Sequence, residues 1–169
     1  MPDPLNPAEL YEITDNTFKL IADDWMLVTA GSTDSFNTMT ASWGCFGELW
    51  HRKIAICFIR PNRYTYEFTE KNDIFTLSFF EEKYRSVLNL CGTKSGRDID
   101  KMSGIGLTPV ASEHDSVYFA EARLVLECRK IYIHDFDPKL FLDPSIEKEY
   151  PEKDYHRMYI GQIMKCLMK

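Results

Sequence analysis

Two short segments of the sequence carry residue types that suit the binding of a phosphorylated, planar molecule. Small side chains and hydroxyls fill residues 37–43, a composition that packs poorly in a core strand but lets a flat ligand approach the backbone closely. Residues 60–65 follow an apolar run and begin with Arg60 and Pro61. Hydroxyls, backbone N–H groups and arginines are the groups that hold a phosphate. Together the segments predict a site for a planar cofactor that carries a phosphate.

A third segment extends this pattern. Residues 91–98 read Cys-Gly-Thr-Lys-Ser-Gly-Arg-Asp, and a weaker match lies at residues 156–161. In this order and spacing, the segments resemble the flavin reductase-like family in its flavoredoxin-type branch, from about Trp25 to Val110. The resemblance implies an FMN-binding split β-barrel and a homodimer with the flavin near the subunit interface. It also implies NADH or NADPH as the electron donor.

FMN needs charge-assisted donors for its phosphate and a flat slot with a few donors for its isoalloxazine ring. With the family in view, Arg60 and Arg97 are the leading candidates for the phosphate or the pyrimidine edge. The alternative is that each forms a surface salt bridge, since Glu67 and Asp98 lie close in sequence. The main-chain N–H groups of residues 39–42 are candidates to face the ring. The predicted cofactor-binding residues are Asn37, Met39, Thr40, Ala41, Ser42, Trp43, Arg60, Tyr64, Thr65, Ser95, Gly96 and Arg97.

Several of these side chains have two interpretations. Trp43 either contacts the flavin or plugs the end of the barrel, because tryptophan is often a packing anchor. Asn37 either binds the ligand or caps the turn after Ser35. His156 either lies over the ring near a partner subunit or is a surface histidine. Arg63, Lys94 and Lys101 are weaker candidates for the site, and a solvated charge is the favoured interpretation of each.

Other kinds of site find little support in the sequence. No two of the four histidines stand at i, i+3 or i+4, so no metal site is predicted. No serine lies in a nucleophile elbow, and the glycines at 104 and 106 lack dinucleotide-binding spacing. None of the five cysteines has CxxC spacing, which predicts free thiols. No catalytic side chain is predicted, because in flavoproteins the cofactor carries the chemistry.

Composition favours one soluble domain. A chain of 169 residues is long enough to bury a core. We divide it into an N-terminal arm at 1–16 and a flavin reductase-like domain at 17–169. A net charge of −6 argues against binding of nucleic acid. The polar, proline-rich start is unlike a signal peptide, and no apolar run has the length of a membrane span. A cytoplasmic location is therefore expected.

The periodicity predicts a mainly β fold with inserted helices, which fits a Greek-key split barrel rather than alternating βαβ units. Residues 1–8 contain three prolines and are expected to form no regular element. Strands are predicted at 17–21, 25–31, 39–43, 53–59, 74–80, 117–136 and 159–167, helices at 63–71, 82–90 and 98–102, and loops at 44–50 and 137–152.

Two functional hypotheses of different classes follow. The first is an FMN-dependent oxidoreductase that passes hydride or electrons from NADH or NADPH through FMN to an acceptor. The second is a flavoredoxin-like electron carrier without its own nicotinamide site, whose acidic surface would dock a redox protein. A third hypothesis is a binding protein for another phosphorylated aromatic molecule.

Overall fold

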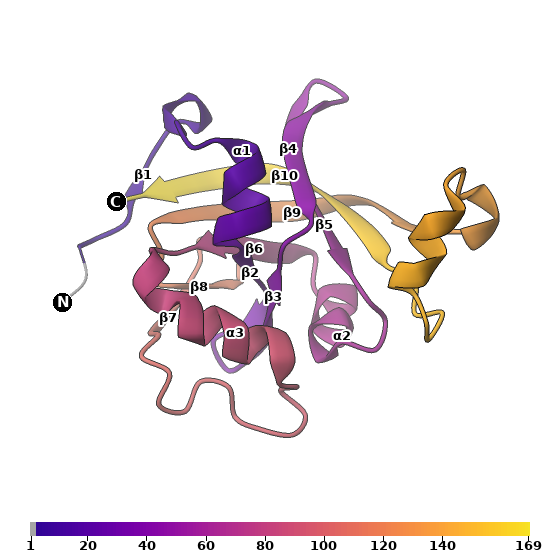
Figure 1. Ribbon diagram of the computed structural model, residues 1–169. Coiled ribbons are helices and arrows are strands. Elements are labelled where there is room, and N and C mark those ends of the chain that lie inside the picture. Colours follow the sequence, from indigo (N-terminus) through magenta and orange to yellow (C-terminus); the bar gives the residue numbers. More distant parts are fainter. Residues whose placement is uncertain (1–2) are drawn as a thin grey trace.

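The computed structural model describes residues 3–169, and Met1 and Pro2 lie outside the described part of the chain. Its main feature is one eight-stranded antiparallel sheet in the order β3-β2-β6-β9-β10-β5-β4, with β1 added beside β10 (Figure 1). A separate hairpin pairs β7 with β8. The strands are β1 (Asn6–Pro7), β2 (Met26–Ser32), β3 (Ser35–Ala41), β4 (Gly44–Leu49), β5 (Arg52–Ile59), β6 (Ile74–Phe79), β7 (Pro109–Ala111), β8 (Val117–Phe119), β9 (Leu124–Asp135) and β10 (Arg157–Met168).

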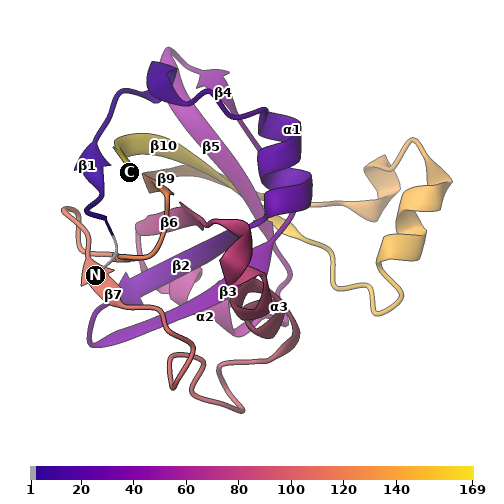
Figure 2. The same cartoon turned by 60° about the vertical axis from the view of Figure 1, so that its left-hand side comes forward.

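The sheet is strongly bent, and β2 and β3 cross the direction of β5 and β10 (Figure 2). Its concave interior is filled by the apolar side chains of the central strands, among them Met26, Phe75, Leu77 and Phe79. Every residue of β6 is buried, as expected for a strand covered on both faces. The prediction of a mainly β split-barrel fold with inserted helices is confirmed.

Two helices lie against the β3 side of the sheet. Helix α2 (Tyr64–Lys71) follows β5, and α3 (Arg85–Thr93) follows β6 after the 3₁₀ turn η3 (Glu82–Tyr84). Both contact β2 and β3. The predicted helix at 63–71 is confirmed, with Arg63 as its N-cap residue. Helix α3 continues past the predicted end and includes Gly92. Within residues 3–169, no helix is both long and apolar enough to cross a membrane.

The N-terminal predictions need two corrections. Residues 17–21 are not a strand: α1 (Thr17–Lys19) begins there and runs into the π-helical turn η2 (Leu20–Asp24). The Asn16 side chain accepts hydrogen bonds from the N–H groups of Phe18 and Lys19, which caps the helix. Among residues 3–8, Asn6 and Pro7 form β1 despite the proline, because a strand on the sheet edge needs only part of its hydrogen bonds. The 3₁₀ turn η1 (Leu10–Glu12) follows it.

Three further segments differ from the prediction. Residues 44–50 are mostly strand β4, paired with β5, rather than a loop. Residues 98–102 form successive turns instead of a helix. The predicted long segment 117–136 is two strands, because a turn at 120–123 separates β8 from β9.

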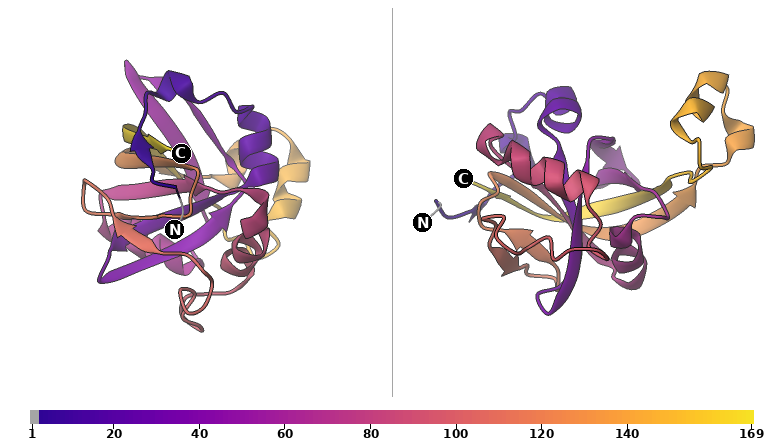
Figure 3. Two further views of the ribbon diagram at one scale, coloured as in Figure 1. Left: turned by 90° about the vertical axis from the view of Figure 1, so that its left-hand side faces the viewer. Right: turned by 60° about the horizontal axis from the view of Figure 1, so that its bottom comes forward.

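Between β9 and β10, residues 136–156 form an excursion that we call the arm. It contains two short 3₁₀ helices, η4 (Pro138–Leu140) and η5 (Pro144–Glu149). The arm stands away from the rest of the molecule at the far ends of β9 and β10, as both Figure 1 and the right panel of Figure 3 show. The predicted loop or lid at 137–152 corresponds to this element.

Candidate functional site

Strand β3 ends one side of the sheet, so one of its edges pairs with no strand among residues 3–169. A two-residue turn joins Ser32 to Ser35, which makes these two residues a hydrogen-bonded pair. Bonded pairs alternate along an antiparallel ladder, so the main-chain groups of Thr38 and Thr40 point away from β2. This edge therefore offers peptide donors and acceptors to a ligand.

The same register corrects one expectation about the main chain. Met39 is opposite Val28 and Ala41 is opposite Met26 in bonded pairs, so their N–H groups are used by β2. Thr38 and Thr40 are the two residues here whose main-chain groups point outward. Thr40 is the nearer of the two to Trp43 in sequence, so its N–H is the one available to a ligand beside Trp43.

A cavity of about 180 Å³ opens beside the end of β3, and we call it the Trp43 cavity. Aromatic rings line it from three elements that are far apart in sequence. Its lining residues are Met39, Thr40, Ala41, Ser42, Trp43, Phe58, Arg60, Arg63 and His156. A flat slot with main-chain groups on one side and aromatic rings on the others is suited to a planar heterocycle.

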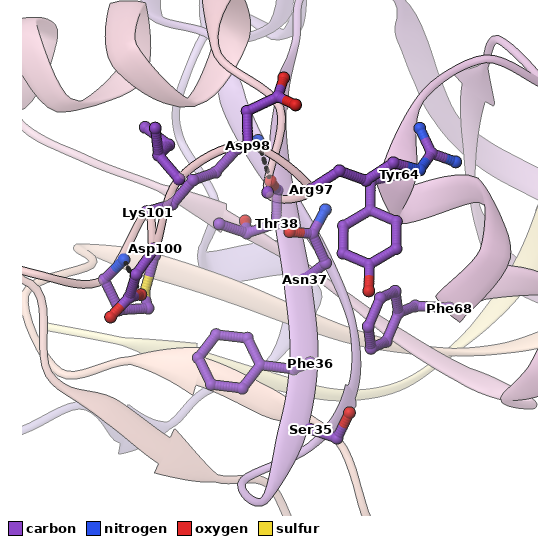
Figure 4. Close-up of a pocket in the computed structure, with 13 residues that line it drawn as sticks. Ser35, Phe36, Asn37, Thr38, Tyr64, Phe68, Arg97, Asp98, Asp100 and Lys101 are labelled. Carbon is purple, nitrogen blue, oxygen red and sulfur yellow. Dashed lines mark hydrogen bonds between the residues drawn. The ribbon is translucent and has the colours of Figure 1, made fainter.

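A second cavity of about 450 Å³ lies along the earlier part of β3, and we call it the Tyr64 cavity. Figure 4 shows the rings of Phe36, Tyr64 and Phe68 around its opening, with Asn37 behind them. The Tyr64 and Phe68 rings meet edge to face, with their centroids 5.1 Å apart. Residues of the 95–102 turns close the other side, including Gly96, Arg97 and Lys101.

Hydrogen bonds to the carbonyl of Cys91 link one lining residue of each cavity. Arg63, which lines the Trp43 cavity, donates from Nη2 to this oxygen at 3.3 Å. Lys101, which lines the Tyr64 cavity, donates from Nζ to the same oxygen at 3.1 Å and to the Thr38 carbonyl at 2.9 Å.

Arg63 and Lys101 lack a counter-charge. No carboxylate of residues 3–169 forms an ion pair with either, and Lys101 is only 5% exposed. Burial lowers the pKa of Lys101 to about 8, and the nearby Arg63 charge acts in the same direction. Burial also lowers the pKa of Arg63, and the neighbouring Arg60 adds to this. Lys101 is buried and Arg63 partly buried, and both have only carbonyl partners. This indicates a place for an anion, because an uncompensated charge shielded from water is costly.

The two arginines that the sequence favoured are placed differently. Arg60 donates from Nη1 to Asp154 Oδ1 at 2.8 Å and from Nη2 to the Glu149 carbonyl at 2.8 Å. Arg97 donates to Glu67 and stacks over the Tyr64 ring at 4.8 Å. Each guanidinium thus has a carboxylate partner, although Arg60 lines the Trp43 cavity and Arg97 lines the Tyr64 cavity.

Asn37 joins the hydroxyl-rich strand to α2. Its Nδ2 donates to Thr65 Oγ1 at 2.7 Å in a buried contact, so the interpretation of Asn37 as a turn cap is wrong. A Cβ on Gly96 would lie 2.2 Å from Asn37 Oδ1 and 3.1 Å from Tyr64 Cδ1. Only glycine lets the 95–97 turn come this close. Ser95 accepts from the Arg97 N–H at 3.2 Å, which stabilises the same turn.

The twelve predicted residues therefore gather in one region. Six line the Trp43 cavity and four line the Tyr64 cavity, while Thr65 and Ser95 lie directly behind Asn37 and Arg97. Arg63 and Lys101 were expected to be solvated, but Lys101 is buried and Arg63 is partly buried. Both lie inside or next to motifs that the sequence singled out, but nothing in the local pattern told a buried cation from an exposed one. Lys94 is exposed, as expected.

The free thiols do not contribute to this geometry. All five cysteines are free, as predicted, and four of them are buried. Burial raises the pKa of Cys91, so its thiol is neutral near pH 7. Cys91 enters the site through its carbonyl oxygen and not through its sulfur.

Comparison with known proteins gives the family. A model of the flavin reductase like domain matches residues 18–168, which is most of the chain. The chain belongs to this family. The resemblance in the three short motifs is thereby confirmed and extends to nearly the whole flavin reductase-like domain. None of the curated proteins compared with the chain matches it.

Solved structures share the fold at low sequence identity. An FMN-binding domain of a flavin reductases-like enzyme from Shewanella baltica has a TM-score of 0.71 at 19% identity, covering 99% of this chain and 78% of that one. Flavoredoxin of Desulfovibrio vulgaris has a TM-score of 0.67 at 24% identity, covering 97% and 77%. An NADH:FAD oxidoreductase from Streptomyces globisporus has a TM-score of 0.63 at 14% identity, covering 85% and 68%.

Proposed function

We propose that this flavin reductase-like chain binds FMN across the two cavities and passes hydride or electrons from NADH or NADPH through the flavin to an acceptor. The observation that carries the proposal is the pair of cations without a counter-charge, the partly buried Arg63 and the buried Lys101, which line one cavity each and share the Cys91 carbonyl. A phosphorylated ligand with a planar ring supplies both the missing negative charge and a group of the right shape for the Trp43 cavity.

The chain's own groups fit such a ligand. The outward N–H of Thr40 would hydrogen-bond an edge of the ring, while Trp43 and Phe58 would keep water from it. Arg63 and Lys101 would hold the phosphate, and Tyr64 and Gly96 would shape the Tyr64 cavity around the chain that carries it. Bound FMN would supply the ring that accepts hydride and passes electrons on.

The visible spectrum of the purified protein tests cofactor binding. We expect flavin absorption bands and one tightly held FMN per chain. A colourless protein that also fails to bind added FMN would contradict the proposal. Binding of another phosphorylated aromatic molecule in its place would favour the third hypothesis.

One specific observation favours the electron-carrier hypothesis. Two of the similar solved structures are flavoredoxins, from Desulfovibrio vulgaris and Methanosarcina acetivorans. Anaerobic addition of NADH or NADPH separates the two hypotheses. We expect the bound flavin to bleach with the nicotinamide alone. Bleaching only with a reductase protein or a chemical reductant would favour the carrier and a docked redox protein.

We also propose a homodimer. Of the aromatic residues in β4 and the turn after it, Phe46 offers little to an interface, because its ring is partly buried against Phe79, with centroids 5.9 Å apart. Trp50 is exposed, with its ring edge to face against that of the exposed Tyr132, and Leu142 on the arm is 98% exposed. Exposed apolar side chains of this size often mark an interface. Sedimentation at micromolar concentration should give a dimer, and a flavin-saturated monomer would exclude it.

A further inference from the structure

The imidazole of His156 connects the arm to the Trp43 cavity. It is buried, and its ring centroid lies 5.0 Å from that of Trp43. On the other side, its Nδ1 lies 2.8 Å from the hydroxyl oxygen of Tyr150, which is also buried. His156 is therefore not a surface histidine, and one of its two nitrogens is already assigned to the arm.

The proton positions follow from the hydrogen-bond partners. The Tyr150 hydroxyl has no other hydrogen-bond partner within residues 3–169, so its proton goes to Nδ1. A neutral imidazole whose Nδ1 accepts must carry its proton on Nε2. Burial lowers the pKa of His156 to about 4, and the charge of Arg60 adds to this, so the ring is neutral near pH 7. The Nε2–H makes no hydrogen bond in the described part of the chain, and the ring lines the Trp43 cavity.

Tyr150 itself is fixed by residues that directly follow β5. Arg60 lies over its ring at 4.9 Å and donates to Asp154 and to the Glu149 carbonyl. Asn62 donates to the second oxygen of Asp154 at 3.0 Å. The arm is thus clamped on both sides of Tyr150 in sequence. Arg60, which the sequence offered as a phosphate ligand, holds the arm against the site.

We propose that Tyr150 is a positioning residue whose hydroxyl holds His156 as the Nε2–H tautomer and aims this N–H at an acceptor atom of the flavin ring. The proposal rests on the proposed function, since it needs FMN in the Trp43 cavity. A donor beside the ring stabilises the reduced flavin more than the oxidised flavin, because reduction adds negative charge. Losing the aimed donor should therefore lower the midpoint potential of the bound flavin.

The test compares Tyr150→Phe with a matched control. Phenylalanine keeps the ring that packs against Arg60 but removes the hydroxyl. Tyr155→Phe is the control, because Tyr155 lies on the same arm with its ring 5.0 Å from that of Tyr150, yet its hydroxyl donates to Glu147. Circular dichroism and FMN titration would first establish that both variants fold and bind flavin.

Two measurements follow. Nitrogen NMR of histidine-labelled, flavin-free protein should show His156 protonated on Nε2 in the wild type and in Tyr155→Phe, and a mixture of tautomers in Tyr150→Phe. In the flavin-loaded protein, Tyr150→Phe should disfavour the reduced flavin about three- to tenfold, which is roughly 15 to 30 mV for a two-electron couple. His156→Gln should lower the potential as well, and adding Tyr150→Phe to it should change little more.

Different results would overturn different claims. An unchanged His156 tautomer in Tyr150→Phe would exclude the positioning role, whether or not the protein binds FMN. Equal potentials for the wild type, Tyr150→Phe and His156→Gln would exclude a hydrogen bond to the flavin. A wild-type protein that binds no FMN would defeat the proposed function, while the NMR measurement would still decide how Tyr150 acts on His156.

Discussion

Two pairs of cations surround the same cavities, and they differ in what neutralises them. Arg60 and Arg97 each form an ion pair with a carboxylate, Asp154 and Glu67 respectively. Arg63 and Lys101 donate only to main-chain carbonyls. Each cation of the first pair is neutralised within the chain, whereas the second pair leaves one buried and one partly buried positive charge for an outside group.

This difference separates structural roles from binding roles. A cation that already has its carboxylate gains less from a second anion, because the new ligand must compete with the partner in place. A buried cation without a counter-ion gains the full charge-assisted hydrogen bond. Mutations of the two pairs should therefore have clearly different effects on FMN affinity, and the predictions below follow the expected size of those effects.

The largest effect is expected from the unpaired cations. Lys101→Met or Arg63→Ala should each weaken FMN binding about ten- to a hundredfold, since a hydrogen bond to a charged group contributes roughly 1.5–3 kcal/mol. Fluorescence titration of the flavin-free protein measures the dissociation constant. Riboflavin serves as the matched ligand, because it lacks the phosphate and its weaker binding should hardly change. Equal losses of affinity for FMN and riboflavin would indicate that these cations bind the edge of the ring and not the phosphate.

The second prediction concerns pH. With its pKa lowered to about 8, Lys101 is charged at pH 7 and loses its proton as the pH rises. Phosphate binding requires the charged form, so FMN affinity should fall by about twofold between pH 7 and 8 and then by up to about tenfold per pH unit. Titrations from pH 7 to 9 would measure this. In Lys101→Met the decline should be absent, and a decline that persists there would assign it to another group.

The same lowered pKa has an opposite consequence for the flavin-free protein. Lys101 binds its proton less tightly in the folded chain than in the unfolded chain. Between about pH 8 and the ordinary lysine pKa, the unfolded chain carries more protons, so the contribution of Lys101 to stability rises with pH. FMN affinity and flavin-free stability should thus move in opposite directions above pH 8.

A smaller effect on binding is expected from Arg60→Ala. This change removes the contacts to Asp154 and Glu149, so the arm should loosen while the cations that we assign to the phosphate remain. We expect FMN affinity to fall by less than about tenfold, in line with the loss of a positioning contact rather than a phosphate ligand. Limited proteolysis should show faster cleavage within residues 136–156. A hundredfold loss of affinity with an intact arm would restore Arg60 as a direct ligand.

The smallest effect is expected from Arg97→Ala. Its ion pair with Glu67 joins two side chains that are each more than 40% exposed, and such pairs contribute about 0.2–1 kcal/mol. FMN affinity should therefore change by less than about fivefold. Thermal unfolding and flavin titration of the same variant would check both statements. A loss as large as that of Lys101→Met would show that Arg97 leaves Glu67 for the phosphate.

The sequence predicted elements well where burial alone determines the pattern. Strands β2, β5, β6 and β10 are dominated by apolar residues, and the first three lie within about one residue of their predicted bounds. The sequence-based prediction failed where one side chain or one pairing strand determines the secondary structure. The cap of Asn16 turns residues 17–21 into a helix, and pairing with β5 turns the apparent loop at 44–50 into β4.

The sequence predicted which residues gather in one region, but not which partners their charged groups have. Three motifs identified the region that Asn37, Trp43 and Gly96 occupy, because segments rich in small and hydroxyl-bearing residues can be recognised from composition alone. The partners of the charged residues were not readable. Asp154 forms its ion pair with Arg60 across 94 positions of sequence. Lys101 reaches its carbonyl partner on Thr38 only when the 95–102 turns fold over β3. Neither fact has a local signal.

The outward edge of β3 has a consequence for how this site can vary. Peptide groups are the same in every residue except proline, so recognition by the edge of a strand survives most exchanges of the side chains that the strand carries. Natural selection can then maintain the position of the strand while many of its side chains change. This offers a physical reason why structures that superimpose closely on this chain share only 14–24% of its residues.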